Sequence, residues 1–357
     1  MTSRERIEAA LRHQEPDRTP VFEYVLLSPV ADQLLGRPYG GDRANWPGVL
    51  RELGWDGAVQ RVAADRVDLA LRLGHDMLYV YSTGSRNALT PKPEEPVAAL
   101  PDDPVERLRL RNALAAAEQP STPGDDYLLI FAYVKEEMKR RGVDLPILAP
   151  AYAHGVWTDV DLMQTMLLDP DVAHEHFRLA TRRALGLVNA YGQLGIEMYG
   201  VGGDFAGTRP LISPRAYREF IMPEVRQVSR RVHELGGWAV NASDGDLWPV
   251  IEDYLVGCEA DGYLEIDLHA GMDLGRLKTA YGDRITFFGN LDPGNTLSFA
   301  SSDEVRRHTL ECLEKGLGNG GHILCASNAI TASVPLENYL AVVNAYRDRF
   351  GLPRFSL

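Results

Sequence analysis

Polar side chains that could carry out acid–base chemistry stand at the ends of short apolar segments. Asp204 follows a Gly-Gly pair, Asp244 precedes a glycine, and Glu265 ends an apolar run. Carboxyl groups can donate and accept protons, so we predict these three as catalytic residues. A second set of side chains offers stacking surfaces or hydrogen bonds to a substrate: Glu23, Tyr81, Tyr152, His154, Asn241, Asn290, Asp292 and Asn328.

Each candidate also has a structural interpretation. Asp204 could cap the turn that follows it, and Asp244 begins a common Asp-Gly turn pair. Asn290 and Asp292 precede a proline and could form an Asx-type turn. His154 fits a buried structural histidine as well as a pocket residue. The functional interpretation rests on the gathering of such residues at segment ends, where apolar packing alone would not place them.

The sequence contains no metal-binding or nucleophile motif. His322 and Cys325 are three residues apart on an expected strand, which puts them on opposite faces. His174 and His176 diverge on an expected helix, and the Cys-x-x-Cys, His-Glu-x-x-His and Gly-x-Ser-x-Gly patterns are absent. Cys325 fits a small buried side chain better than a nucleophile. A metal held by carboxylates at the strand ends stays open as an alternative.

Eight short segments are typical of buried parallel strands, because they are rich in β-branched and aromatic residues. They cover residues 21–24, 77–81, 145–152, 196–203, 237–241, 262–266, 285–289 and 322–325. Helical patterns separate them, which predicts an α/β fold: a single (β/α)8 TIM barrel over residues 1–357. We expect an N-terminal helical extension and a long insertion after strand two, at residues 83–126 with a short helix at 104–118. A doubly wound open sheet is the alternative.

Helix starts are visible at two places in the sequence. Asp169 with Pro170 and Ser213 with Pro214 each combine an N-cap residue with proline at the first helical position. Pro223 lies inside the second helical pattern and should kink or split that helix.

In a barrel, active-site groups come from the C-terminal ends of the strands and the loops that follow. The polar candidates above occupy those positions.

The charge balance excludes several classes of protein. The 357 residues include 37 Lys+Arg and 50 Asp+Glu, giving a formal net charge of −13, whereas a nucleic-acid-binding protein normally carries a basic excess. Residues 1–18 lack the apolar core of a signal peptide, and the longest apolar run, 127–134, is far short of the roughly 20 residues that span a bilayer. Three scattered cysteines fit a reducing compartment. We expect a cytoplasmic protein that binds neither nucleic acid nor membrane.

Short motifs occur in a characteristic order along the chain. They are residues 4–11, 16–21, 203–205, 210–214 with Tyr217, Phe220 and Pro223, 270–274, 277–278, 281–284, 289–290 with Asp292, and 335–338. Together they resemble the uroporphyrinogen decarboxylase superfamily, and the resemblance implies a (β/α)8 barrel. One branch of the superfamily is the porphyrin decarboxylase. The other branch contains methyltransferases that move a methyl group from a corrinoid protein to an acceptor.

The resemblance to the decarboxylase branch is the weaker one. Its substrate carries eight carboxylates, which calls for arginines at the barrel mouth. Its Arg-x-Ala-Gly-Arg-Tyr signature after strand one is replaced by Phe-Glu-Tyr-Val-Leu-Leu-Ser-Pro at residues 22–29. Arg209 is the only arginine close behind the expected strand ends, although Arg86 lies in the long loop.

The methyltransferase branch fits better, with one departure. Members that methylate a thiol hold zinc with a His-x-Cys pair before a glycine and a further cysteine after strand eight. The corresponding positions are Ala242, Asp244 and Asn328, so the resemblance implies no thiol-activating zinc. The N5 amine of tetrahydrofolate is already a nucleophile and needs positioning more than activation. Zinc-free members of the superfamily use this acceptor.

We therefore predict a methyltransferase that moves a methyl group between a corrinoid (methylcobalamin), carried by a partner protein, and tetrahydrofolate. Asp204 and Asn241 would hold the pterin, and Glu265 or Asp244 would be the acid–base group near N5. The polar rim would be completed by Asp244, Asn290 and Asn328. A decarboxylase or other lyase acting on a smaller carboxylic acid, and a zinc-less barrel that only binds a ligand, are the alternatives. A homodimer is expected from its general frequency.

Overall fold

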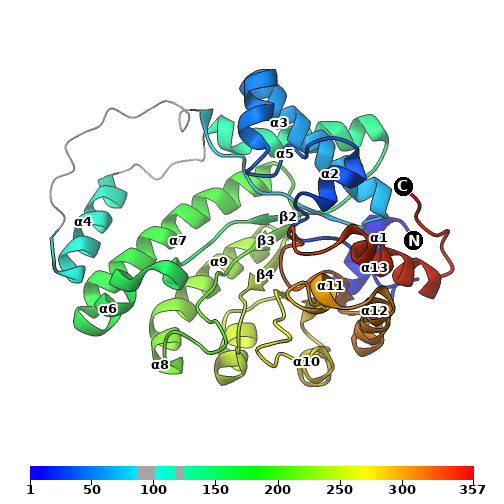
Figure 1. Cartoon of the computed structure of the whole chain (residues 1–357). Helices are drawn as coiled ribbons and strands as arrows, with labels where there is room; N and C mark the ends of the chain where they lie inside the picture. Colours follow the sequence, from blue (N-terminus) through cyan, green and yellow to red (C-terminus); the bar gives the residue numbers. More distant parts are fainter. Residues whose placement is uncertain (87–100, 118–123) are drawn as a thin grey trace. The chain divides into compact units, whose positions relative to one another are not determined.

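The computed structural model describes residues 1–86, 101–117 and 124–357. They form two compact units, which are described separately (Figure 1). The first unit comprises Met1–Thr83, Leu129–Leu148 and Gly262–Leu357, and the second comprises Gly84–Leu128 and Ala149–Asp261. The single domain over residues 1–357 stays a prediction. Among the described residues, we find no helix with the length and apolar character that crossing a membrane requires.

The first unit contains short parallel strands that are almost completely buried. β1 (Leu78–Tyr79) pairs with the first half of β2 (Ile147–Pro150). β6 (Thr286–Phe288) lies between β5 (Gly262–Leu264) and β7 (His322–Ile323), and pairs in parallel with both. Most of their side chains are apolar, as expected of strands that face a core on one side and covering helices on the other, while Thr286 and His322 are buried polar exceptions.

The N-terminal segment bridges two of these strands. Val21 forms one parallel bridge with Leu324, directly after β7. The N–H of Phe22 donates to the carbonyl of Leu324 (3.1 Å), and the N–H of Asp76 donates to the carbonyl of Val21 (2.7 Å). The prediction of a strand at residues 21–24 is wrong in extent, because the pairing moves on to Ile330 beyond Phe22. The segment nevertheless lies where a barrel would need its first strand.

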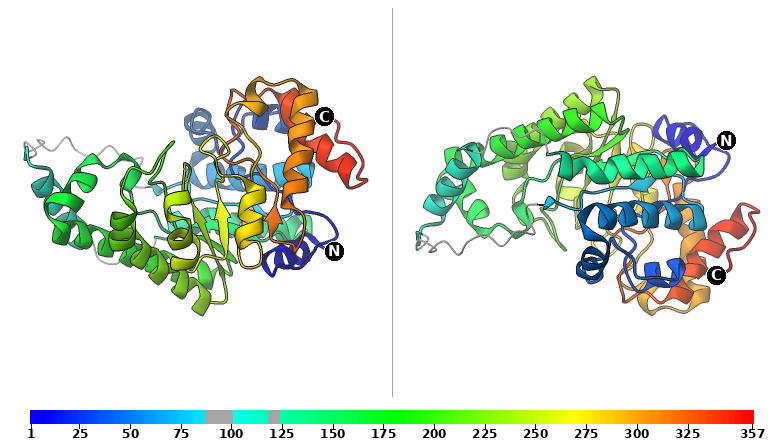
Figure 2. Two further views of the ribbon diagram at one scale, coloured as in Figure 1. Left: turned by 90° about the horizontal axis from the view of Figure 1, so that it is seen from below. Right: turned by 90° about the horizontal axis from the view of Figure 1, so that it is seen from above.

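Helices surround the strands of the first unit. Figure 1 and Figure 2 show α12 and α13 lying side by side, and this pair packs extensively. The helices are α1 (Ser3–Leu11), α2 (Val30–Leu35), α3 (Trp46–Leu73), α5 (Asp125–Arg141), which enters from the second unit, α10 (Leu274–Tyr281), α11 (Thr296–Phe299), α12 (Ser302–Gly316) and α13 (Leu336–Arg349).

An ion-pair network connects α1 to Asp76, which lies two residues before β1. Asp76 is fully buried, and its carboxylate accepts from Arg6 Nη1 (2.5 Å) and Arg18 Nη1 (3.0 Å). The same carboxylate accepts from the backbone N–H of Val21 (3.1 Å) and from the hydroxyl of Ser3 (3.0 Å). The arginines of the N-terminal motif thus hold the chain against the start of β1.

The second unit is built on β3 (Met198–Gly200) and β4 (Trp238–Ala242), which pair in parallel. Residues 151 and 152, just after β2, donate their N–H groups to the carbonyl of Gly200 (2.9 and 3.0 Å). The helical segments are α4 (Pro104–Ala117), η2 (Val156–Thr158), α6 (Val160–Leu168), α7 (Pro170–Gln193), α8 (Pro214–Ala216), η3 (Tyr217–Ile221), α9 (Met222–Glu234), η4 (Trp248–Val250) and η5 (Asp253–Gly257).

The predicted helix starts are confirmed. Asp169 accepts a hydrogen bond from Val172 N–H at the start of α7, and Ser213 accepts one from Ala216 N–H at the start of α8. The helical pattern around Pro223 is divided into α8, the π-helical turn η3 and α9, as its missing N–H predicts. The short helix predicted at 104–118 is α4, while residues 87–100 and 118–123 of the expected insertion lie outside the described residues.

Within each unit the paired strands follow one another in chain order: β1 with β2, and β5, β6 and β7, in the first unit, and β3 with β4 in the second. All of these pairings are parallel. Each strand overlaps one of the segments predicted from the sequence, and only β4 runs beyond its segment, by one residue at Ala242. The predicted α/β class with a parallel sheet is therefore confirmed. The closed eight-stranded barrel, its N-terminal extension and the insertion after strand two stay predictions, with which this sheet is compatible.

Candidate functional site

The predicted site residues divide between the two units. The first unit holds Glu23, Tyr81, Glu265, Asn290, Asp292 and Asn328. The second unit holds Tyr152, His154, Asp204, Asn241 and Asp244. Each set follows the strands of its own unit, and each is described within that unit.

Glu23 is the most unusual acid of the first unit. Its Oε1 accepts hydrogen bonds from Ala326 N–H (3.2 Å) and Tyr24 N–H (3.3 Å). Burial raises the pKa of Glu23 to about 8, although both N–H groups and the Tyr339 hydroxyl act in the opposite direction. The side chain is therefore a protonated carboxylic acid at neutral pH, and it can donate a proton as well as accept one.

Glu265 and two tyrosines lie beside it. Burial, followed by the charge of Glu265, raises the pKa of Tyr24, and Glu265 also acts on Tyr79. The rings of Tyr24 and Tyr79 are 4.6 Å apart, centroid to centroid. Glu265 is only 8% exposed and has a φ of 70°, a left-handed conformation that costs a non-glycine residue about 1 kcal/mol. We call Glu23, Tyr24, Tyr79 and Glu265 the carboxyl–tyrosine cluster.

A small cavity adjoins this cluster. Its volume is about 40 Å³, and its lining includes Glu23, Tyr24, Tyr39, Arg66 and Tyr81. Tyr81 is thus placed at a cavity, as a substrate-binding residue should be. Arg66 and Tyr39 are not among the site residues predicted from the sequence. Both precede the strand ends by many residues, and no local pattern around them indicates a site.

The amides predicted to contact a substrate are engaged with their own chain. Asn290 is 3% exposed; its N–H donates to Cys312 Sγ (3.1 Å) and its Nδ2 donates to the carbonyl of Met272 (3.4 Å). Asn328 is half-buried, and its Oδ1 accepts from Ala329 N–H (2.6 Å). Asn290 therefore orders the backbone after β6, and Asn328 has the more accessible side chain.

Asp292 organises the loop after β6. It is 3% exposed and accepts from the N–H groups of Asn295 (3.1 Å) and Thr296 (2.9 Å), as the Asx-turn interpretation expects. Its carboxylate also accepts from the Thr296 hydroxyl (2.8 Å) and contacts His269 Nε2 at 2.8 Å. Burial raises the pKa of Asp292, but the hydrogen bonds from Thr296, His269 and Asn295 outweigh burial and lower it. The residue remains ionised and mainly structural.

The second unit brings two predicted acids together. Asp204 Oδ1 accepts the N–H of Asp244 at 3.0 Å, and both side chains are half-buried. Gly245 follows with a φ of 93°, and a Cβ atom there would lie 2.1 Å from the carbonyl oxygen of Gly207. The Asp-Gly turn therefore needs glycine for space as well as for conformation.

Replacing Gly245 by alanine tests this close approach. We expect G245A to lose roughly 2–4 kcal/mol of unfolding free energy, because the added methyl group must displace backbone and Ala206. Gly236 has a φ of 76° and nothing within 4 Å of a Cβ position, so G236A should lose only about 1 kcal/mol from conformation alone. Urea unfolding of both variants makes the comparison. Equal losses would contradict the packing argument.

The other predicted residues of the second unit are buried. Asn241 is 1% exposed; its Nδ2 donates to the carbonyl of Tyr254 (3.1 Å) and its Oδ1 accepts from Ala242 N–H (3.1 Å). His154 is 1% exposed, and burial lowers its pKa to about 4, so it is neutral at pH 7. Tyr152 is 5% exposed. In this structure Asn241 holds the backbone, while Asp204 and Asp244 remain accessible to a ligand.

Side chains that could bind metal do not cluster in the part of the chain that the structure describes: no group of three or more His, Cys, Asp or Glu residues could hold an ion there.

The three cysteines are free and buried. Cys258 Sγ contacts the Tyr217 hydroxyl at 3.2 Å, and burial raises its pKa to about 12. Burial likewise raises the pKa of Cys325 well above its usual range, which agrees with the interpretation of this residue as a small buried side chain.

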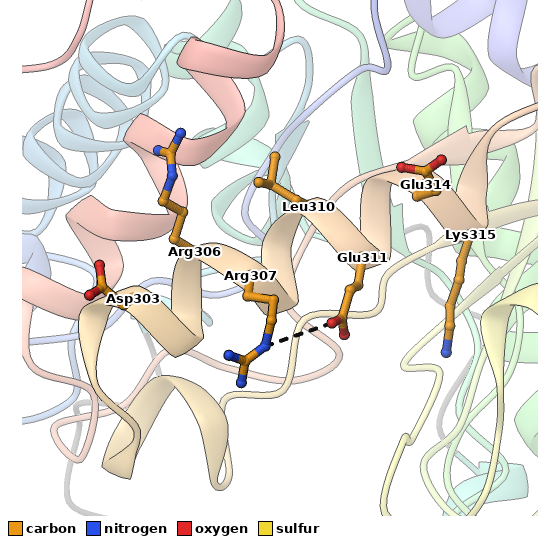
Figure 3. A pocket seen from close by; sticks show the side chains of 7 residues that line it. All are labelled: Asp303, Arg306, Arg307, Leu310, Glu311, Glu314 and Lys315. Carbon is orange, nitrogen blue, oxygen red and sulfur yellow. Dashed lines mark ion pairs between the residues drawn. The ribbon is translucent and has the colours of Figure 1, made fainter.

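A larger hollow of about 590 Å³ lies along the surface of α12. Figure 3 shows that its labelled side chains all come from this helix, and that Arg307 reaches Glu311 one turn later (3.8 Å). Charged pairs at this spacing are typical of a solvated helix face. None of the predicted site residues lines the hollow.

Comparisons with known proteins identify relatives of this chain. The sequence profile described as "Uroporphyrinogen decarboxylase (URO-D)" matches residues 148–349. The uroporphyrinogen decarboxylase of Coxiella burnetii (strain Dugway 5J108-111) is 26% identical over 186 residues, which are 50% of this chain and 48% of that protein. The enzyme of the same name from Aromatoleum aromaticum is 27% identical over 181 residues, 49% of this chain and 48% of that protein.

The chain therefore spans about half the length of the curated relatives it matches. A solved structure, a methyltransferase from Methanosarcina mazei, is similar over nearly the whole chain. The TM-score is 0.69 at 19% sequence identity, covering 98% of this chain and 99% of that one. At this identity the likeness shows a shared fold.

Proposed function

The chain belongs to the uroporphyrinogen decarboxylase family, and we propose that within it this protein is a corrinoid-dependent methyltransferase whose second substrate is tetrahydrofolate. The observation that carries the proposal is the carboxyl–tyrosine cluster of the first unit. It combines a carboxylic acid with a pKa near 8 and a series of half-buried tyrosine rings. The resemblance of the whole chain to the methyltransferase branch supplies the reaction.

The acid matches what the N5 amine of tetrahydrofolate requires. When N5–H accepts a methyl group, its proton must leave, and ionised Glu23 takes it. When the transfer runs in reverse, protonated Glu23 returns the proton to N5 as the methyl group departs. A group with a pKa close to the working pH serves both directions. We therefore propose Glu23 as the acid–base residue, in place of Glu265 or Asp244.

The tyrosines offer a surface for a flat heterocycle. The rings of Tyr79 and Tyr81 are 5.8 Å apart and continue the pair formed by Tyr24 and Tyr79. The rings in these pairs are tilted by 55° and 47°, and such tilted tyrosines offer both ring faces and ring edges to a further aromatic ring. A bound corrinoid protein would supply or remove the methyl group, and we assign no residue to the corrinoid. In the second unit, Asp204 and Asp244 remain our candidates for polar contacts to a substrate.

The experiment is a methyl-transfer assay with the full chain. Methylcobalamin, free or bound to a corrinoid protein, is mixed with tetrahydrofolate, and loss of the Co–C absorbance is followed while methyltetrahydrofolate is measured by mass spectrometry. Turnover without added zinc supports the proposal. The absence of turnover with both forms of the cofactor, or turnover that requires a thiol acceptor and zinc, would refute it.

A lyase acting on a smaller carboxylic acid is the second candidate function. It is favoured by the names of the curated relatives and by Arg66 at the cavity beside Glu23, since such an arginine could hold an acid. Arg209, the arginine that the sequence places behind a strand end, is exposed. Release of carbon dioxide from small aromatic or heteroaromatic acids, with no methyl transfer, would decide for this candidate.

A further inference from the structure

Arg66 is a buried arginine that lies behind the tyrosines of the first unit. It belongs to α3, and the whole residue is 6% exposed. Its Nη1 donates to the carbonyl of Tyr79 (2.8 Å), and its guanidinium carbon is 4.0 Å from the centre of the Tyr81 ring. These two contacts fix the plane of the guanidinium and satisfy one of its nitrogens.

The opposite edge of this guanidinium makes no hydrogen bond within the described part of the chain, although Arg66 is close enough to Tyr39 to act on the pKa of its hydroxyl. Nε and Nη2 are buried and make no hydrogen bond to any residue that the structure describes. No ion pair of Arg66 is found among those residues either, because neighbouring Asp65 is occupied by Arg37 (2.6 Å) and Arg61 (3.1 Å). A buried charge without a counterion is strongly unfavourable, so this edge calls for an anionic partner.

Other arginines of the chain show what this edge binds. Arg107 places Nε and Nη2 on the two oxygens of Asp161 (3.0 and 2.7 Å). Arg354 holds Asp348 in the same way (2.9 and 2.7 Å). The two parallel N–H groups match the spacing of carboxylate oxygens, which a spherical ion such as chloride does not reproduce.

The cavity next to Arg66 has room for such a group. Its volume of about 40 Å³ exceeds the roughly 10–15 Å³ that a cavity of this kind needs to hold one water molecule, and its lining joins Arg66 and Tyr39 to Glu23. Burial raises the pKa of Tyr39 to about 12 although Arg66 lowers it, so Tyr39 offers a neutral hydroxyl donor. We propose that the Nε and Nη2 edge of Arg66 binds a carboxylate group in this cavity.

The carboxylate comes either from a small free acid or from one arm of a larger substrate that also reaches the carboxyl–tyrosine cluster. Binding at Arg66 involves no covalent step, so the proposal does not depend on methyl transfer. It assigns a role to an arginine that the sequence analysis did not single out, and it adds a positive anchor to a protein with a net charge of −13.

The test measures binding of acetate to the full chain by saturation-transfer NMR, with acetamide as the neutral isostere and chloride as a competitor. We expect acetate to bind, acetamide to give no saturable signal, and chloride to displace acetate poorly. In R66M, which keeps an apolar stem of similar length, acetate binding should weaken at least about tenfold. R72Q removes another arginine of α3, whose Nη1 donates to the carbonyl of Leu34 (2.6 Å), and should bind acetate normally.

Thermal unfolding shows whether R66M folds. Because it loses an unpaired buried charge, it should melt at or above the wild-type temperature in buffer without carboxylates. The two sources are separated by comparing tetrahydrofolate with a tetrahydropterin that lacks the glutamate arm. If R66M loses affinity for tetrahydrofolate but binds the tetrahydropterin as the wild type does, the carboxylate is an arm of the substrate. Two results would overturn the proposal, whatever the methyl-transfer assay shows. One is a wild-type protein that binds neither acetate nor the glutamate arm of tetrahydrofolate. The other is an R66M protein that binds both with unchanged affinity.

Discussion

Replacing Asp76 by asparagine is expected to lower the free energy of unfolding by roughly 3–5 kcal/mol. The carboxylate is fully buried and compensates two arginines, Arg6 at 2.5 Å and Arg18 at 3.0 Å. Asparagine keeps an oxygen that can accept hydrogen bonds but removes the charge. Arg6, itself 5% exposed, would then have only Asp17 to balance it, at 2.7 Å.

Urea unfolding of D76N measures this effect, and D144N provides the matched control. Asp144 also pairs with an arginine, Arg4, but its side chain is 68% exposed, so its loss should cost less than about 1 kcal/mol. A second readout is hydrogen exchange in α1, which should become faster in D76N because the network fastens this helix. If D76N and D144N had the same unfolding free energy, the buried network around Asp76 would contribute no more to stability than the exposed pair of Asp144.

Replacing Glu23 by glutamine is expected to reduce the proposed methyl transfer by about 10²- to 10³-fold. Glutamine keeps the size and an acceptor oxygen for Ala326 N–H but cannot exchange a proton. In the wild-type protein, transfer to tetrahydrofolate should rise as pH increases through about 8, where Glu23 ionises, and the reverse reaction should fall over the same range. Rates of E23Q should lack this pH dependence.

The same substitution changes stability in a direction that depends on pH. Burial raises the pKa of Glu23 from 4.5 to about 8, so between these values the folded protein keeps a proton that the unfolded chain releases. Stability from this group is therefore fully present below pH 4.5 and is lost as pH rises toward 8. The difference in unfolding free energy between E23Q and wild type should therefore change with pH. Between pH 4.5 and pH 9 it should shift in favour of E23Q by on the order of 2–4 kcal/mol.

Denaturant unfolding at several pH values checks this expectation. Glu311, on the surface of α12 with a side chain 61% exposed, supplies the control E311Q, which should leave the pH dependence unchanged. An E23Q protein with the wild-type pH profile of stability would show that Glu23 is ionised in the folded state. The proposed acid–base role of Glu23, which requires the raised pKa, would then be refuted as well.

Local signals in the sequence determined the positions of the main elements. Asp169 and Ser213 cap helices where expected, because a cap bonds to an N–H only three residues away. Seven of the eight predicted strand segments contain a strand, since a buried strand needs a short run that is apolar on both faces. The segment at residues 21–24 differs because its pairing depends on Leu324 and Ile330, far along the chain.

The sequence also placed polar residues at the strand ends and identified the family by their order. It could not decide which of them are accessible. Asn241 lies near the end of β4 and Asp204 follows β3. Asn241 is nevertheless 1% exposed and bonded to the carbonyl of Tyr254, whereas Asp204 is half-buried. That difference arises from the packing of η5, which no pattern next to Asn241 reveals.

The sequence by itself thus determined the α/β class, the strand and helix positions and the superfamily, because these depend on local periodicity, capping and motif order. Only the tertiary structure decided that Glu23 is a protonated acid and that Arg66 is buried with an unpaired edge. Both properties depend on residues remote in sequence. Burial raises the pKa of Glu23 against the opposing hydrogen bonds from Ala326 and Tyr339, and the ring of Tyr81 covers the guanidinium of Arg66. Proton affinity and charge compensation are set by such distant neighbours, so they become visible only when the chain is folded.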